Sequence, residues 1–82
     1  MNRIKLFFFA TIRDRVGAKS IEMDVPLDMT IQGLKDKLVS DYPNLAAAMP
    51  SVLFSINREY AFDDALVPLN AEVALFPPVS GG

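Results

Sequence analysis

The sequence predicts an α+β domain in which one main helix packs on one face of a mixed sheet of about five strands. Three observations support this fold class. Several short segments alternate apolar and polar residues, as half-buried strands do. One longer segment repeats apolar residues at helical spacing. The chain also has 82 residues, of which 51% are hydrophobic, so it can form one buried core but not two.

The first two strands are predicted at residues 3–10 (RIKLFFFA) and 20–25 (SIEMDV). Residues 11–17 between them predict a short turn or helical connection. Only Gly-Ala-Lys then precedes the second strand, so we expect the two strands to pair as a hairpin. Alternation places these residues on the inward faces: Ile4, Leu6, Phe8 and Ala10 of the first strand, and Ile21, Met23 and Val25 of the second.

The main helix is predicted to follow Pro26, with Thr30 as its N-cap. It should run for about three turns and end before Pro43. Gly33 weakens its first turn by about 1 kcal/mol relative to alanine. A further helical turn is expected within residues 44–49. The inward face of the helix repeats at Ile31, Leu34, Leu38 and Tyr42.

The second half of the sequence predicts a strand at 51–56, a short strand around Tyr60 and a last strand at 72–76. Asn57 and Arg58 form a turn between the first two of these. Residues 62–71 have no regular pattern. The predicted core is Ile4, Leu6, Phe8, Ile21, Met23, Leu34, Leu38, Val52, Phe54, Ile56, Val73 and Leu75.

Composition disfavours several classes of function. There is no cysteine and no histidine, which removes thiol nucleophiles, zinc thiolates and the usual general base. The formal net charge of −2 disfavours binding to nucleic acid or to an anionic membrane. Uninterrupted apolar runs such as residues 6–10 are too short to span a bilayer, and we expect the protein in the cytoplasm. Asp63 and Asp64 are a weak candidate for a cation site, because a divalent ion needs more oxygen ligands.

Residues 76–82 (FPPVSGG) differ from an ordinary strand end. Pro77 and Pro78 cannot continue a hydrogen-bonded ladder and favour an extended path. The side chains then become smaller toward Gly81 and Gly82, so this segment could enter a narrow tunnel in which any Cβ atom would clash. We therefore divide the chain into a domain at 1–76 and an extended tail at 77–82. The alternative is that these residues are an ordinary slack terminus.

Apolar residues also occupy the outward face of the predicted sheet. Phe7 and Phe9 lie opposite the inward face of the first strand, and Ala74 and Phe76 lie opposite that of the last. If these two strands are neighbours, the four residues form one patch of the kind that marks partner surfaces. The alternative is that residues 62–71 cover this second face.

The segments LFFFATIRDRVG and EVALFPPVSGG resemble those of the small sulfur-carrier subunits of molybdopterin synthase, over the whole chain. The resemblance implies the ubiquitin-like β-grasp fold, with the first and last strands adjacent and parallel at the centre of the sheet. Two positions depart from the family pattern. Asn70-Ala71 stands where Asp-Gly is usual before the last strand, and Gly33 stands where glutamate is common.

The resemblance also implies roles for particular residues. Gly82 would be adenylated by an ATP-dependent activating enzyme, then converted to a thiocarboxylate, with Gly81 as its slim support. No cofactor would be permanently bound, and no metal or nucleic acid is implied. The chain would be a sulfur-donating subunit without catalytic activity of its own, in a heterotetramer with the large catalytic subunit. Residues expected to contact partners are Phe7, Phe9, Arg13, Tyr60, Phe76, Pro77, Pro78 and Val79.

Three other functions remain open from the sequence. A sulfur carrier of the thiamine pathway would share the fold and the Gly-Gly sequence but deliver sulfur to another acceptor. A ubiquitin-like protein modifier would join the Gly82 carboxylate to a lysine. A plain binding module would not use the tail, so removing Gly82 would leave its function intact.

Overall fold

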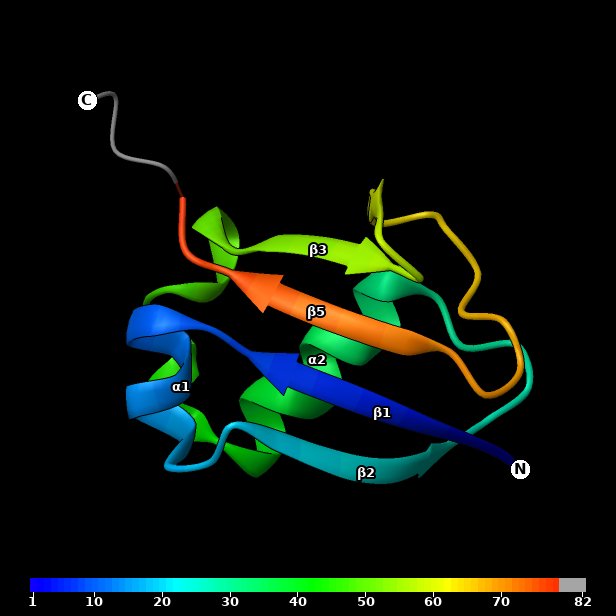
Figure 1. The fold of residues 1–82 in the computed structure, drawn as a ribbon, viewed down its shortest axis with the longest axis horizontal. Coiled ribbons are helices and arrows are strands. Elements are labelled where there is room, and N and C mark those ends of the chain that lie inside the picture. Colours follow the sequence, from blue (N-terminus) through cyan, green and yellow to red (C-terminus); the bar gives the residue numbers. More distant parts are fainter. Residues whose placement is uncertain (79–82) are drawn as a thin grey trace.

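β1 (Asn2–Phe8) and β5 (Glu72–Phe76) run parallel at the centre of a five-stranded mixed sheet in this computed structural model, which describes residues 1–78. The strand order is β2-β1-β5-β3-β4, and α2 crosses one face of the sheet (Figure 1). The remaining elements are α1 (Ala10–Val16), β2 (Ser20–Val25), α2 (Ile31–Asp41), β3 (Leu53–Ile56), β4 (Glu59–Ala61) and the 3₁₀ turns Pro43–Leu45 and Met49–Ser51. The parallel central pair confirms the topology that the resemblance implies.

The predicted first strand begins one residue too late and ends two residues too late, since β1 spans Asn2–Phe8. Ile4, Leu6 and Phe8 are buried as expected, but Ala10 is exposed and belongs to α1. The backbone of Ala10 has a φ of 51°, a left-handed conformation that ends the extended path of β1. β1 and β2 are antiparallel neighbours, as predicted, and α1 forms the helical connection that was expected between them.

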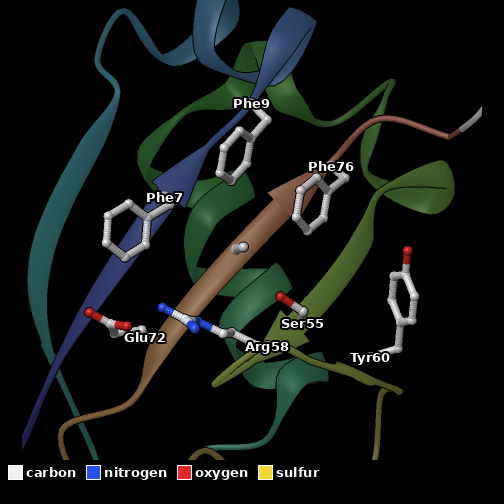
Figure 2. A pocket seen from close by; sticks show the side chains of 8 residues that line it. Phe7, Phe9, Ser55, Arg58, Tyr60, Glu72 and Phe76 are labelled. Carbon is white, nitrogen blue, oxygen red and sulfur yellow. The ribbon is translucent and has the colours of Figure 1, made fainter.

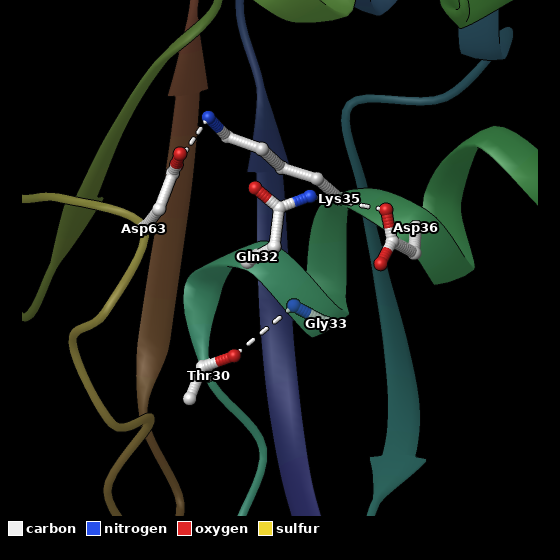
Figure 3. Close-up of polar contacts among 6 residues, drawn as sticks. All are labelled: Thr30, Gln32, Gly33, Lys35, Asp36 and Asp63. Carbon is white, nitrogen blue, oxygen red and sulfur yellow. Dashed lines mark hydrogen bonds and ion pairs between the residues drawn. The ribbon is translucent and has the colours of Figure 1, made fainter.

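α2 forms where helical spacing and the cap predict it. Thr30 Oγ1 accepts a hydrogen bond from the backbone N–H of Gly33 at 3.1 Å (Figure 3). This bond satisfies one of the free N–H groups of the first turn. The helix ends at Asp41, and its buried residues are Ile31, Leu34 and Leu38.

The irregular segment 62–71 packs against the start of α2. Backbone N–H groups of Ile31 and Gln32 donate to the carbonyl oxygens of Ala65 and Asp63, each at 3.0 Å. Lys35 Nζ pairs with the Asp63 carboxylate at 2.5 Å (Figure 3). Asp63 is therefore engaged by a lysine, and no group of acidic side chains suited to a metal occurs in the described part of the chain. The segment lies over one end of the helical layer, not over the opposite sheet face.

The core lies between the sheet and α2. Nine of the predicted core residues are buried, whereas Ile21, Met23 and Ile56 are half-buried and pack against it. The sequence pattern missed buried residues in segments that lack strand or helix periodicity, namely Ile12, Leu45, Met49, Val67 and Ala71. No helix within residues 1–78 is long and apolar enough to cross a membrane.

Candidate functional site

The sheet face opposite α2 carries an aromatic surface over its two central strands (Figure 2). Phe7, Phe9, Ala74 and Phe76 line a shallow hollow of about 460 Å³ there. We call these four residues the aromatic face. Phe7 of β1 lies beside Ala74 of β5 in the parallel register, which brings the two strands' outward residues together. The alternative in which residues 62–71 cover this face is wrong, since none of them lines the hollow.

Phe9 and Phe76 form the end of this surface that lies farthest from Glu72 and Arg58 (Figure 2). Their rings stack with centroids 4.8 Å apart and planes inclined by 9°. The backbone N–H of Phe9 donates to the carbonyl oxygen of Leu75 at 3.2 Å, so Phe9 extends the β1–β5 contact beyond the end of β1. Although stacked, Phe9 remains 44% exposed. Phe76 is half-buried. A partly exposed aromatic pair of this kind offers a large contact area to a partner protein.

Polar side chains border the aromatic face at its other end. Ser55 of β3, Arg58 of the β3–β4 turn, Tyr60 of β4 and Glu72 of β5 complete the lining of the hollow (Figure 2). Tyr60 is 72% exposed, and its side chain stands at the border of the sheet. The surface thus combines an apolar centre with a polar rim, the usual composition of a protein–protein interface.

The structure brings four predicted contact residues together and leaves one apart. Phe7, Phe9, Tyr60 and Phe76 share the hollow, whereas Arg13 is exposed on α1 and does not line it. The tail sequence follows directly from Phe76, with Pro77 half-buried and Pro78 exposed. The predicted roles of Val79, Gly81 and Gly82 lie outside the described residues.

Sequence reasoning did not identify Arg58, Glu72 or Ser55 as part of the site. Asn57 and Arg58 were predicted only as a turn. Both have positive φ, 49° and 74°, as the two-residue connection between β3 and β4 requires. The alternation of β5 could have placed Glu72 in the site, because Glu72 shares the outward face with Ala74 and Phe76.

A comparison with protein-family models decides the family. The model described as the ThiS family matches residues 6–82, which is nearly the whole chain. The chain belongs to the ThiS family.

Curated relatives of this ThiS-family chain are named molybdopterin synthase sulfur carrier subunits. The protein of that name from Dictyostelium discoideum is 37% identical over 84 residues, covering 99% of this chain and 98% of the relative. The one from Arabidopsis thaliana is 35% identical over 79 residues, covering 96% of this chain and 82% of the relative. Both alignments extend over nearly the whole of this chain, so the likeness is not limited to a motif.

A solved structure supports the same fold. SAMP1 from Haloferax volcanii superimposes with a TM-score of 0.84 at 28% identity, covering 99% of this chain and all of that one. The ubiquitin-like β-grasp fold predicted for this ThiS-family chain is therefore confirmed.

Proposed function

We propose that this chain is the sulfur-carrier subunit of a molybdopterin synthase and that Gly82 carries the sulfur as a thiocarboxylate. One structural observation supports this proposal above the others. The stacked pair of Phe9 and Phe76 lies at the point where β5 ends and the Pro-Pro-Val-Ser-Gly-Gly sequence begins. A partner that binds the aromatic face is thus placed beside the root of the tail.

The Gly82 carboxylate needs activation before it can accept sulfur. A terminal carboxyl group has a pKa of about 3.3–3.7, so it is ionised at neutral pH and is a poor electrophile. In the proposed reaction a carboxylate oxygen attacks the α-phosphorus of ATP in an activating enzyme, and pyrophosphate leaves. Hydrosulfide, or a donor that releases sulfur at the same oxidation level, then attacks the carbonyl carbon, and AMP leaves with one of the carboxylate oxygens. The product is the thiocarboxylate. ATP is a substrate of the activating enzyme and is not held by this chain.

The large subunit of the synthase would supply the catalytic groups. The thiocarboxylate sulfur is anionic at neutral pH and would be delivered to a cyclic pyranopterin precursor, whose dithiolene it helps to build. Docking through the aromatic face keeps this sulfur at a high effective concentration in the partner's active site. A heterotetramer of two small and two large subunits is the assembly we propose. The cytoplasmic location expected from the sequence stays a prediction.

The intact mass of the protein tests the proposed chemistry. Incubation with the activating enzyme, ATP and a sulfur source should raise the mass by the difference between one sulfur and one oxygen atom. Omission of ATP should abolish the increase, because the acyl-adenylate cannot form. A variant lacking Gly82 serves as the matched control for modification elsewhere in the chain.

The same incubation separates the rival functions. A ladder of heavier conjugates in cell extract, resistant to denaturation, would indicate a protein modifier joined to lysine. A thiocarboxylate that forms but is not consumed by the large subunit and pyranopterin would indicate another acceptor, such as one in the thiamine pathway. Unchanged mass under all conditions would contradict the sulfur-carrier proposal.

A further inference from the structure

Two cations lie at the lower border of the aromatic face. Lys5 Nζ stands 5.2 Å from the centroid of the Phe7 ring, and Arg58 lines the hollow itself. Figure 2 shows the Arg58 guanidinium reaching across the sheet face from the β3–β4 turn, on the side of Glu72. Neither cation forms an ion pair within residues 1–78, where the four pairs found involve Arg3, Lys35 and Lys37.

The charges at this border do not cancel. Glu72 lies beside Lys5 in the parallel register of β1 and β5, and it also lines the hollow with Arg58. The Glu72 carboxylate can therefore offset only one of the two cations, Lys5 and Arg58. This border keeps one uncompensated positive charge, although the net charge of the chain is −2. Arg3 on the same face differs, because Glu22 and Asp24 pair with it at 3.4 and 3.3 Å, and Asp24 raises the pKa of its guanidinium.

The backbone at Arg58 is unfavourable for an arginine. A two-residue turn with positive φ at both positions favours glycine at its second residue, yet Arg58 adopts a φ of 74° there. The turn is held in place by Asn57, whose backbone N–H donates to the Glu72 carbonyl at 2.8 Å and whose Oδ1 accepts from the Glu72 N–H at 3.0 Å. These bonds fix the turn without using the Arg58 side chain. Unfavourable conformations of this kind persist most often at functional sites.

We propose that Arg58, assisted by Lys5, is a specificity-determining residue of the aromatic face and binds a carboxylate side chain of the protein partner. The planar guanidinium matches a carboxylate in a two-bond geometry that lysine cannot reproduce. The surrounding rings exclude water when a partner docks, which strengthens such a pair and makes arginine a frequent hot spot. A single carboxylate matches the one uncompensated positive charge. A phosphate dianion carries about twice the negative charge and would be repelled more strongly by Glu72. The identity of the partner rests on the proposed function, but the carboxylate contact does not.

Binding of the cognate large subunit of molybdopterin synthase, measured by calorimetry, tests this contact. Arg58→Gln should weaken binding at least about tenfold, because a charge-assisted hydrogen bond is lost. Arg58→Lys should recover only part of the affinity. Arg58→Gly should weaken binding as much as Arg58→Gln without lowering the melting temperature, since glycine suits the turn. Lys19→Gln removes the same charge outside the hollow and should change affinity by less than about twofold.

The carboxylate itself can be located by exchanging charges. Arg58→Glu combined with an Asp→Lys or Glu→Lys variant of the large subunit should restore binding for one acidic residue of the partner. If the unmodified chain binds and Arg58→Gln binds equally well, the inference is wrong and the proposed function stands. Failure of every charge exchange would also overturn the carboxylate contact. If the unmodified chain does not bind the large subunit, the proposed function fails, and the same variants titrated against the activating enzyme decide the inference.

Discussion

The side chain of Asn2 bonds to the loop that leads into β5, with its Oδ1 accepting from the backbone N–H of Asn70 at 2.8 Å. Its Nδ2 donates to the carbonyl oxygens of Pro68 at 2.8 Å and Val67 at 3.4 Å. Asn2 is 1% exposed, so these bonds are made inside the protein. Asn70 has a φ of 57°, a conformation that asparagine tolerates better than most residues. One buried amide thus ties the first strand to the turn before the last.

Removing this amide should destabilise the fold. Asn2→Ala leaves the Pro68 carbonyl and the Asn70 N–H without their partner, and we expect a loss of about 1–3 kcal/mol in the free energy of unfolding. Urea denaturation measures this loss. Arg3→Ala is the control on the adjacent residue of β1, where the ion pairs are exposed and their loss should lower the stability much less than the loss of the Asn2 amide. Equal stability of Asn2→Ala and the unmodified protein would show that the amide bonds are not needed.

The aromatic face should carry much of the partner affinity. Phe9→Ala and Phe76→Ala should each weaken binding to the large subunit by about 1–3 kcal/mol while the monomer stays folded. Their effects should not add fully, because the two rings stack on each other. Calorimetric titration of both single variants and the double variant measures this.

Phe62→Ala provides the control for the aromatic face. Phe62 is 78% exposed but lies outside the hollow, so its loss should leave the affinity unchanged. If Phe62→Ala weakens binding as much as Phe9→Ala does, the partner uses another surface.

The tail sequence should be needed for sulfur transfer and not for folding. Deletion of Gly82 shortens the tail by about 3.3 Å, a large error when reacting atoms must approach to about 3–3.5 Å. Gly81→Ile adds a branched side chain where we infer a narrow channel in the partner. Both changes should abolish product formation, whereas Ser80→Ala keeps the length and small size of the tail and should be active. Within residues 1–78 the last buried residue is Leu75, so we expect unchanged melting temperatures. Full activity without Gly82 would end the carrier hypothesis.

Gly33 offers a way to stabilise α2. Replacing a glycine inside a helix by alanine gains about 0.5–1 kcal/mol from helix propensity. A Cβ at Gly33 would come within 2.7 Å of Met29 Sδ, so the flexible Met29 side chain must move first. Gly33→Ala should therefore gain less in the natural sequence than in a Met29→Ala background. Urea denaturation of the natural sequence, both single variants and the double variant measures the gain in each background. A loss of stability on Gly33→Ala in both backgrounds would contradict the expected gain.

The regular elements were predictable because their signals are local. Alternation in 72–76 matches β5 to the residue, and Thr30 marks the start of α2. The outward position of Phe7 follows from the same alternation, and this made the aromatic face visible in the sequence. The end of β1 was not predictable, since the left-handed backbone at Ala10 has no counterpart in the alternation, which continues through that residue.

Other features depend on contacts that are distant in the sequence. Asn2 lies on the inward face of β1, and its polar side chain can be buried there because its amide bonds to backbone groups of residues 67–70. Leu45 and Val67 are buried without lying in any helix or strand of matching period. The contribution of Arg58 to the hollow depends on the φ of the turn, which sets where its side chain is directed. Composition alone does not specify that direction.

The central place of β5 also constrains the order of folding. The residues of the β1–β2 and β3–β4 pairs are made earlier in synthesis. In the sheet formed by residues 1–78, β5 alone joins these two pairs. Until residues 72–76 emerge from the ribosome, β1 and β3 each present an unpaired edge of the kind that promotes aggregation. The closing step joins segments near opposite ends of the described chain, a non-local contact that slows folding. Emergence of residues 72–76 from the ribosome, rather than the early growth of the chain, is thus the step after which the sheet can be completed.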